Sequence, residues 1–172
     1  SLMLRDDTFI EFIKNPRVLD AYTEIGGIAA TLKNSGGWIT DPVEFRHDAE
    51  EVQKYKEDMS YKKGWHRASE PKWAIYEDED NPGMHHFPFL RFFVYLTDVG
   101  PGDGGTLAMV KSHKVRGDFS EVSKSCEAIE ATCNAGDALL FTESLMHASP
   151  QILSENTRYS MTYAFVPAFY SN

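Results

Sequence analysis

Cysteine is scarce in this sequence, and long hydrophobic runs are missing. The chain of 172 residues has two cysteines, Cys126 and Cys133, on either side of a segment with strand character. Because a disulfide framework uses more cysteines in a smaller chain, we expect free thiols in a reducing, cytoplasmic compartment. No run approaches the roughly 18 apolar residues of a transmembrane helix, and residues 1–7 lack the apolar core of a signal peptide.

Positive charge is also in short supply. The 17 Lys and Arg residues stand against 26 Asp and Glu residues, which gives a formal net charge of −9 at pH 7. A protein that binds duplex nucleic acid or an anionic membrane surface needs a basic face, and no basic stretch is present. The acidic residues 77–80 form a local cluster that is typical of a solvated loop. We therefore expect no nucleic-acid partner and no membrane partner.

The signatures of several enzyme classes are absent. There is no His-Glu-x-x-His pair and no Cys-x-x-Cys pair, which argues against the common zinc sites. Gly-x-Ser-x-Gly is missing too, which argues against a serine hydrolase. The glycines at residues 100–105 lack the Lys-Ser/Thr pair and the helix that follow in a phosphate loop. We interpret them as a turn.

Aromatic residues, in contrast, are abundant, with 11 Phe, 8 Tyr and 3 Trp. Flat side chains of this kind fill the space between two sheets well. The length suits one domain, and the sequence has no internal repeat and no low-complexity linker. We predict a single domain over residues 1–172.

Residues 6–30 have helical periodicity. Apolar residues recur at three-to-four spacing on both sides of Pro16, which starts a second helix, and Gly26-Gly27 ends the pattern. From Asn34 to Pro88 the chain is polar and irregular, apart from a helical run from Asp48 to Met59. So long a stretch without strong periodicity is usually functional or mobile.

Short strands separated by glycine-rich turns follow. We expect strands at residues 89–96, 106–110, 127–132, 138–141 and 158–166. Because no helices intervene, the pattern favours a double-sheet architecture such as a jelly roll. With N-terminal helices packed on one sheet, the predicted fold is mainly β, an α+β variant of the double-stranded β-helix.

One segment carries most of the chemical information. A turn at residues 134–137 leads into the apolar strand 138–141, and His147 follows; Arg158 comes eleven residues later. Two adjacent strands joined by a loop would place this His and this Arg near each other inside the barrel. A metal-bound His beside an inward-facing Arg suits 2-oxoglutarate, which chelates a metal at one end and presents a carboxylate to a guanidinium at the other.

This segment resembles the phytanoyl-CoA dioxygenase (PhyH) family. In that family a metal-binding His, a Ser two residues later and an Arg eleven residues later have the arrangement of His147, Ser149 and Arg158. Residues 95–99 and 104–114 also resemble the family's strand, glycine turn and Pro-Gly-Ser-His signature, in which two residues differ here. Since the family's N-terminal region is usually longer, we expect the chain to lack part of it.

The resemblance implies an iron(II)/2-oxoglutarate oxygenase that hydroxylates a C–H bond of a small molecule. It also implies that His147 is one iron ligand and that His66, which precedes the strand at 95–99 by about thirty residues, is the other. Ser149 and Arg158 would bind the cosubstrate carboxylate, and Arg67 is a further candidate for binding the cosubstrate.

The iron carboxylate of the family belongs to a His-x-Asp motif, and this chain has Ala68 where the Asp is expected. Two histidines and one carboxylate leave three iron positions for 2-oxoglutarate and oxygen. Three interpretations stay open. Glu70 or Asp48 supplies the carboxylate; or the position is open to halide, as in iron/2-oxoglutarate halogenases; or the iron site is lost and the chain is a non-catalytic jelly-roll binding domain.

The other histidines are weaker candidates. His85 and His86 remain rivals to His66, although we interpret both as structural, and we interpret His113 as a structural residue hydrogen-bonded beside a turn. The strand at 89–96 should turn alternate side chains towards the cavity. The substrate cannot be specified, because the match to the family is poorest between residues 34 and 84.

Overall fold

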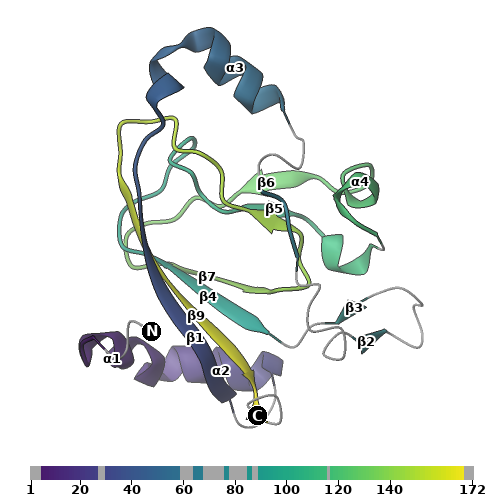
Figure 1. Ribbon diagram of the computed structural model, residues 1–172. Helices are drawn as coiled ribbons and strands as arrows, with labels where there is room; N and C mark the ends of the chain where they lie inside the picture. Colours follow the sequence, from purple (N-terminus) through teal and green to yellow (C-terminus); the bar gives the residue numbers. More distant parts are fainter. Residues whose placement is uncertain are drawn as a thin grey trace.

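The computed structural model describes residues 5–26, 30–58, 64–67, 76–77, 85–86, 89–115 and 117–168. Within these residues, two antiparallel sheets face each other (Figure 1). The larger sheet has the order β1 (Ala30–Thr40), β9 (Arg158–Pro167), β4 (Leu90–Tyr95), β7 (Ala138–Thr142). The smaller has the order β6 (Ala128–Glu130), β5 (Leu107–Met109), β8 (His147–Ala148), and β2 (Tyr76–Glu77) pairs with β3 (His85–His86). The arrangement is a jelly roll, which confirms the predicted fold class.

Two helices cover the outer face of the larger sheet. α1 (Thr8–Lys14) ends before Pro16, whose ring cannot continue a helix, and α2 (Pro16–Gly26) begins there. In Figure 1 both helices lie against the larger sheet, on the side away from the smaller one. Val18 and Tyr22 of α2 share a buried core with Phe92 and Phe165. This packing confirms the predicted position of the N-terminal helices.

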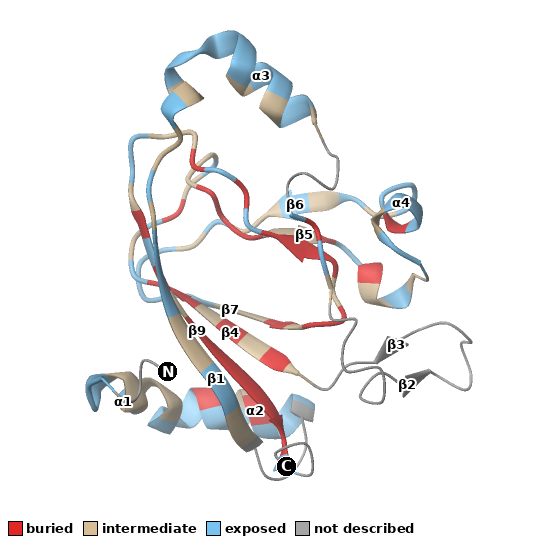
Figure 2. Cartoon of the chain, in the orientation of Figure 1, coloured by how far each residue is buried: buried red, intermediate tan, exposed pale blue. Residues whose placement is uncertain are grey.

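Side chains of β4 alternate between the two faces of the larger sheet, as they do in any strand. Phe92 and Val94 belong to the core beneath α2, whereas Arg91 and Phe93 line a cavity on the opposite face. Figure 2 shows that buried residues are concentrated along the neighbouring strands β4 and β9. The period of two thus separates side chains that stabilise the fold from side chains that form the site.

A second core lies behind the smaller sheet. Trp65, Met109 and Met146 pack there together with Val122. Val122 ends the short helix α4 (Phe119–Val122), and η5 (Ser112–Lys114) precedes it. Trp65 stacks on Phe119 with ring centroids 5.9 Å apart. Because this core anchors Trp65, it also fixes the backbone of the residue that follows.

The first part of the stretch from Asn34 onward is a strand, so the prediction of irregular structure was wrong there. β1 pairs with the whole length of β9, from Ala30 opposite Pro167 to Thr40 opposite Arg158. Its central residues 34–37 are Asn-Ser-Gly-Gly, which have low strand propensity. The strand therefore depends on its partner rather than on local preference.

The helical run predicted from Asp48 is confirmed as α3 (Ala49–Glu57), after the short helix η2 (Glu44–His47). The Asp48 carboxylate accepts hydrogen bonds from the backbone N–H groups of Glu50 and Glu51, which caps α3. Both cysteines are free thiols, as predicted. None of the helices in the described ranges is long and apolar enough to cross a membrane.

Candidate functional site

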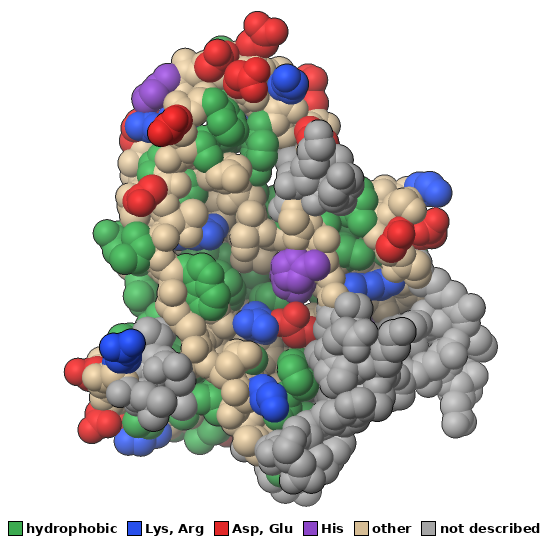
Figure 3. All heavy atoms as spheres, in the orientation of Figure 1, with side chains coloured by type: hydrophobic (Ala, Val, Ile, Leu, Met, Phe, Trp, Pro, Cys, Tyr) green, Lys and Arg blue, Asp and Glu red, His purple; other side chains and the backbone are tan. Residues whose placement is uncertain are grey.

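A cavity of about 420 Å³ lies between the two sheets. Its lining comes from β1, β4, β7, β8 and β9, from residue 66, and from residues 106, 143 and 149–151 outside the strands. On the face drawn in Figure 3, histidine side chains lie near the centre, next to side chains of both charges. The cavity brings together four residues that the sequence singled out, namely His66, His147, Ser149 and Arg158.

His66 and His147 lie opposite each other as an antiparallel bridge. The backbone N–H of each residue donates to the carbonyl oxygen of the other, both at 2.9 Å. Their imidazole rings lie on the same side, with centroids 4.2 Å apart. Residues that are 81 positions apart in the chain are thus held side by side by the backbone itself.

Both imidazoles are oriented in the same way. Nδ1 of His66 lies 2.7 Å from the carbonyl oxygen of Gly64, and Nδ1 of His147 lies 2.8 Å from that of Leu145. A carbonyl oxygen only accepts, so Nδ1 is the donor in each ring. A neutral ring of this tautomer carries its free lone pair on Nε2, which is the arrangement of a metal-binding histidine.

Burial lowers the pKa of His147, and the neighbouring His66 adds to this effect, whereas the hydrogen bond to Leu145 opposes it. The charged imidazolium is disfavoured because the low-dielectric surroundings solvate it poorly. His147 is therefore neutral near pH 7, and its Nε2 lone pair is available to a metal ion.

Arg158 is a buried cation without a counterion among the described residues. Its side chain starts at the beginning of β9, and only 4% of the residue is exposed. Nη2 donates to Oγ1 of Thr40 over a long 3.4 Å, and Nε has no hydrogen-bond partner within the described ranges. Burial lowers the pKa of Arg158, with partial compensation from Tyr95 and Glu130. An orphaned guanidinium of this kind favours an anionic ligand.

A second arginine in the cavity is already neutralised. Nε of Arg91 forms an ion pair with Oε1 of the buried Glu143, and Nη1 donates to Oγ1 of Thr162 at 2.9 Å. All three side chains line the cavity. The contrast with Arg158 is clear: one guanidinium has its carboxylate inside the protein, and the other does not.

The donors suit a metal and a dicarboxylate. His66 and His147 line the same cavity as Arg158, whose Nε has no hydrogen-bond partner among the described residues. In the parts of the chain that the structure describes, no group of three or more His, Cys, Asp or Glu side chains is close enough to hold a metal ion. Among the described residues, His66 and His147 are therefore the candidate metal ligands.

The sequence model of the phytanoyl-CoA dioxygenase (PhyH) family matches residues 62–160, which contain every one of these donors. The chain belongs to this family. Dioxygenase olcK from Penicillium canescens is 29% identical over 99 residues, which make up 58% of this chain and 31% of that protein. The chain thus spans about a third of this curated relative.

Solved structures share the PhyH-type fold. HygX from Streptomyces hygroscopicus, solved with nickel and 2-oxoglutarate bound, superposes with a TM-score of 0.66 and 17% identity over 98% of this chain and 71% of that one. The α-ketoglutarate-dependent epimerase SnoN from nogalamycin biosynthesis superposes with a TM-score of 0.62 and 16% identity, over 97% of this chain and 59% of that one. EvdMO1 superposes with a TM-score of 0.61 and 14% identity, over 92% of this chain and 32% of that one.

Other residues predicted from the PhyH resemblance lie elsewhere. Arg67 is not among the residues that line the cavity, because its guanidinium donates to the carbonyl oxygens of Ser112, Val115 and Gly117. It connects the segment that carries His66 to η5 and to the residues that follow η5. Asp48 is engaged as the cap of α3. Ala68 and Glu70 lie outside the described residues.

The histidines predicted to be structural lie in η5 and β3. His113 belongs to η5, beside the smaller sheet, and the neighbouring Ser112 accepts the backbone N–H of Met146 at 2.8 Å. That bond holds the segment immediately before His147. His85 and His86 form β3, which pairs with β2.

Sequence reasoning missed the cavity residues Arg91, Glu143, Thr40 and Trp38 as individual members of the site. For Arg91 a signal was present, because it alternates with Leu90 and Phe92 in an apolar strand. A charge in such a position either faces solvent or lines a cavity. For Thr40 and Trp38 no signal existed, since they belong to β1, which forms only against β9.

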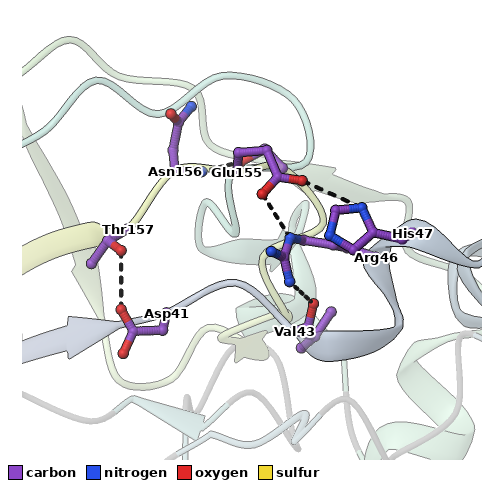
Figure 4. A network of polar contacts seen from close by, with 8 residues as sticks. Asp41, Val43, Arg46, His47, Glu155, Asn156 and Thr157 are labelled. Carbon is purple, nitrogen blue, oxygen red and sulfur yellow. Dashed lines mark hydrogen bonds and ion pairs between the residues drawn. The ribbon is translucent and has the colours of Figure 1, made fainter.

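The loop between His147 and Arg158 is held from outside by the segment after β1 (Figure 4). Thr157 Oγ1 donates to Oδ1 of Asp41 at 3.0 Å, and Nε of Arg46 donates to Oε2 of Glu155 at 2.9 Å. The backbone N–H of Gln151 donates to the Tyr55 hydroxyl at 2.8 Å. These contacts fix the connection that carries Ser149.

Proposed function

We propose that this chain carries the iron(II) and 2-oxoglutarate site of an oxygenase that hydroxylates a C–H bond of a small molecule. One observation supports the proposal most: two imidazoles whose Nδ1 atoms are already hydrogen-bonded line the same cavity as a buried guanidinium that has no counterion among the described residues. A metal-binding pair and an anion-binding group in one cavity are what a metal-chelating dicarboxylate needs.

His66 and His147 would hold the iron through Nε2. Their Nδ1 hydrogen bonds to Gly64 and Leu145 fix the ring orientation and raise the basicity of Nε2. The backbone bridge between the two residues sets their separation before any metal arrives. Little reorganisation is then needed on binding.

Arg158 would bind the far carboxylate of 2-oxoglutarate, assisted by Ser149. The guanidinium fork can donate two parallel hydrogen bonds to a carboxylate, which fixes its direction as well as its position. Arg91 is a poorer candidate, because Glu143 already neutralises it. The cosubstrate would therefore lie between the histidines and Arg158.

Bound iron(II) would supply the oxygen activation by which 2-oxoglutarate, O₂ and a substrate C–H give succinate, CO₂ and an alcohol. The chain's own contribution is to orient the cosubstrate and to exclude water. Phe141 packs edge-on against the His147 ring at 4.7 Å, and Phe93 adds a second apolar wall. Such walls limit side reactions of activated oxygen with water and protein.

The third protein ligand decides between two oxygenase chemistries. Asp48 is engaged in capping α3, so Glu70 is the remaining carboxylate candidate of the two. If no carboxylate binds, the Ala68 position would admit halide, and the enzyme would be an iron/2-oxoglutarate halogenase. A non-catalytic binding domain is the alternative from another class.

The test is addition of Fe(II) and 2-oxoglutarate under anaerobic conditions, with detection of the visible metal-to-ligand charge-transfer band. We expect the band in the wild-type chain and its loss in His147→Ala. His47→Ala is the matched control, because His47 lies on the surface and outside the cavity lining. A folded wild-type chain without the band would overturn the oxygenase proposal in favour of a binding domain.

The same assay distinguishes the two chemistries. If Glu70 is the carboxylate ligand, Glu70→Ala loses the band and chloride has no effect on it. If the position is open to halide, Glu70→Ala keeps the band and added chloride shifts it.

A further inference from the structure

Trp38 is the most exposed large apolar side chain in the cavity lining. It lies near the end of β1 and lines the same cavity as the two histidines. The residue is 49% exposed, whereas Phe141 in the same lining is buried. Burying an indole contributes more than burying almost any other side chain, so a half-exposed one at a cavity is unusual for a purely structural residue.

A glycine holds the indole in place. A Cβ built at Gly36 would lie 2.4 Å from both Cη2 and Cζ3 of Trp38, so the ring folds back over Gly36 along the strand. Residues two apart share one face of a strand, which is why the ring reaches that position. Any side chain at residue 36 would push the indole away. The indole thus occupies the space that a side chain at residue 36 would fill.

β9, which lies between β1 and β4 in the sheet, leaves room beside the indole of Trp38. Trp38 is paired with Ser160 of β9, and Phe93 of β4 is paired with Thr162. Because both β9 residues are small, the rings of Trp38 and Phe93 reach across them to a centroid distance of 6.5 Å with a 37° tilt. Phe93 in turn lies 5.3 Å from Tyr95. The result is an aromatic wall with Trp38 at its exposed end.

Both arginines of the cavity have an anionic partner that is not the substrate. Arg91 is matched by Glu143, and Arg158 would be matched by the cosubstrate carboxylate. The aromatic wall is therefore an uncharged surface of the cavity that is left for a substrate. A flat apolar face binds a planar ring best, since two π-systems stack in an offset or edge-to-face manner.

We propose that Trp38 binds the substrate by stacking and that the substrate carries a planar, unsaturated, uncharged ring. The inference rests on the proposed function, because it assigns the same cavity to the substrate of the oxygenase. Trp38 does not touch the metal-binding histidines in this assignment; it determines which molecules enter.

The test compares two probes that share the carbon skeleton and the position of the hydroxyl, the planar aromatic 2-naphthol and the saturated, non-planar decahydro-2-naphthol. Binding to the intact chain is measured by ligand-observed NMR, with and without Fe(II) and 2-oxoglutarate. We expect 2-naphthol to bind roughly two- to tenfold more tightly than decahydro-2-naphthol, because stacking on Trp38 adds to the burial that both probes share. Trp38→Ala should abolish the preference, and Trp38→Phe should keep part of it.

Two further variants make the test specific. Gly36→Val should displace the indole and remove the preference while leaving Trp38 in the sequence. Ile39→Ala is the matched control, because Ile39 is 69% exposed, lies next to Trp38 and is outside the cavity lining. Circular dichroism confirms that each variant is folded; if Trp38→Ala is not, the Gly36→Val and Trp38→Phe variants carry the test.

The outcomes separate the two proposals. Equal binding of both probes, or an unchanged preference in folded Gly36→Val, would overturn the stacking role even if the charge-transfer band is present. Absence of the band together with a preference that depends on Trp38 would overturn the oxygenase and leave the planar-ligand site.

Discussion

Arg158 and Arg91 show that the surroundings of an arginine decide whether its charge is paired within the protein or available to a ligand. Both are arginines in one cavity, yet Arg91 has Glu143 and Thr162 as partners, and Nε of Arg158 has none among the described residues. A buried guanidinium without an anion is destabilising unless a ligand supplies one. A bound carboxylate would remove this cost, in agreement with the proposed role of Arg158.

Arg158→Lys should therefore weaken 2-oxoglutarate binding. A lysine keeps the charge but loses the planar fork, so one of two charge-assisted hydrogen bonds is lost. We expect affinity to fall about ten- to a hundredfold, measured by titrating 2-oxoglutarate against the Fe(II)-loaded chain without oxygen. Arg46→Lys, at the surface ion pair with Glu155, is the control and should leave the affinity unchanged. Unchanged affinity in Arg158→Lys would contradict the assigned role.

Gly104 offers a second test at the same scale. It adopts a left-handed φ of +73°, and a Cβ there would lie 2.8 Å from Ile152 Cγ1 and 3.1 Å from Arg158 Nη1. Gly104→Ala should lower stability by about 1–2 kcal/mol or more and also weaken 2-oxoglutarate binding, because the guanidinium must move.

Gly102→Ala is the matched control for this prediction. Gly102 has a φ of +87°, but a Cβ there meets nothing within 4 Å. The control should show the backbone strain in its thermal midpoint while its 2-oxoglutarate affinity stays that of the wild type. Similar affinity losses in both variants would mean that strain in the turn, and not contact with Arg158, is responsible.

Among the elements, α3 and the segment before it have a supporting role. They contact the loop between β8 and β9 through Asp41, Arg46 and Tyr55. The ion pair between the half-buried Arg46 and the exposed Glu155 contributes little by itself, since solvent at the Glu155 carboxylate screens it. Several such contacts together hold the loop that carries Ser149.

Asp48→Ala should destabilise the chain by about 1 kcal/mol, because the first turn of α3 loses its cap. Asp48→Asn should restore most of the stability, since an asparagine side chain caps as well. Thermal or denaturant unfolding measures both. The Fe(II)/2-oxoglutarate band should persist in both variants; its loss in Asp48→Asn would reinstate Asp48 as a metal ligand.

At the scale of the whole molecule, the two faces of the larger sheet are separate in function. The outer face packs on α1 and α2, where Phe12 stacks on Tyr163 at 4.7 Å and meets Phe92 edge-on at 6.0 Å. The inner face forms the cavity. Stability and chemistry can therefore be perturbed independently on one sheet.

Phe92→Ala tests this separation. The side chain is buried in the core beneath α2, so its removal should cost about 3–5 kcal/mol, measured by denaturant unfolding. The neighbouring Phe93→Leu, on the cavity face, should cost much less stability. At a temperature where both are folded, Phe92→Ala should retain the Fe(II)/2-oxoglutarate band. A small loss of stability in Phe92→Ala would contradict the assignment of this core.

The jelly-roll class, the N-terminal helices and most strand positions followed from local patterns. Apolar alternation and glycine turns are recorded in neighbouring residues, so 89–96 and 158–166 were recognisable as β4 and β9. β1 was missed because its Asn-Ser-Gly-Gly centre has no strand preference of its own. Its partner, more than a hundred residues away, supplies the hydrogen bonds.

The sequence by itself determined the identity and spacing of His147, Ser149 and Arg158, because one loop joins them. Only the tertiary structure decided that His66 lies beside His147, that Arg158 has no counterion within the described residues, and that Arg91 has one. The reason is physical: ring orientation, burial and ion pairing arise between strands that are distant in the chain. No local pattern records which of two arginines will find its carboxylate inside the protein.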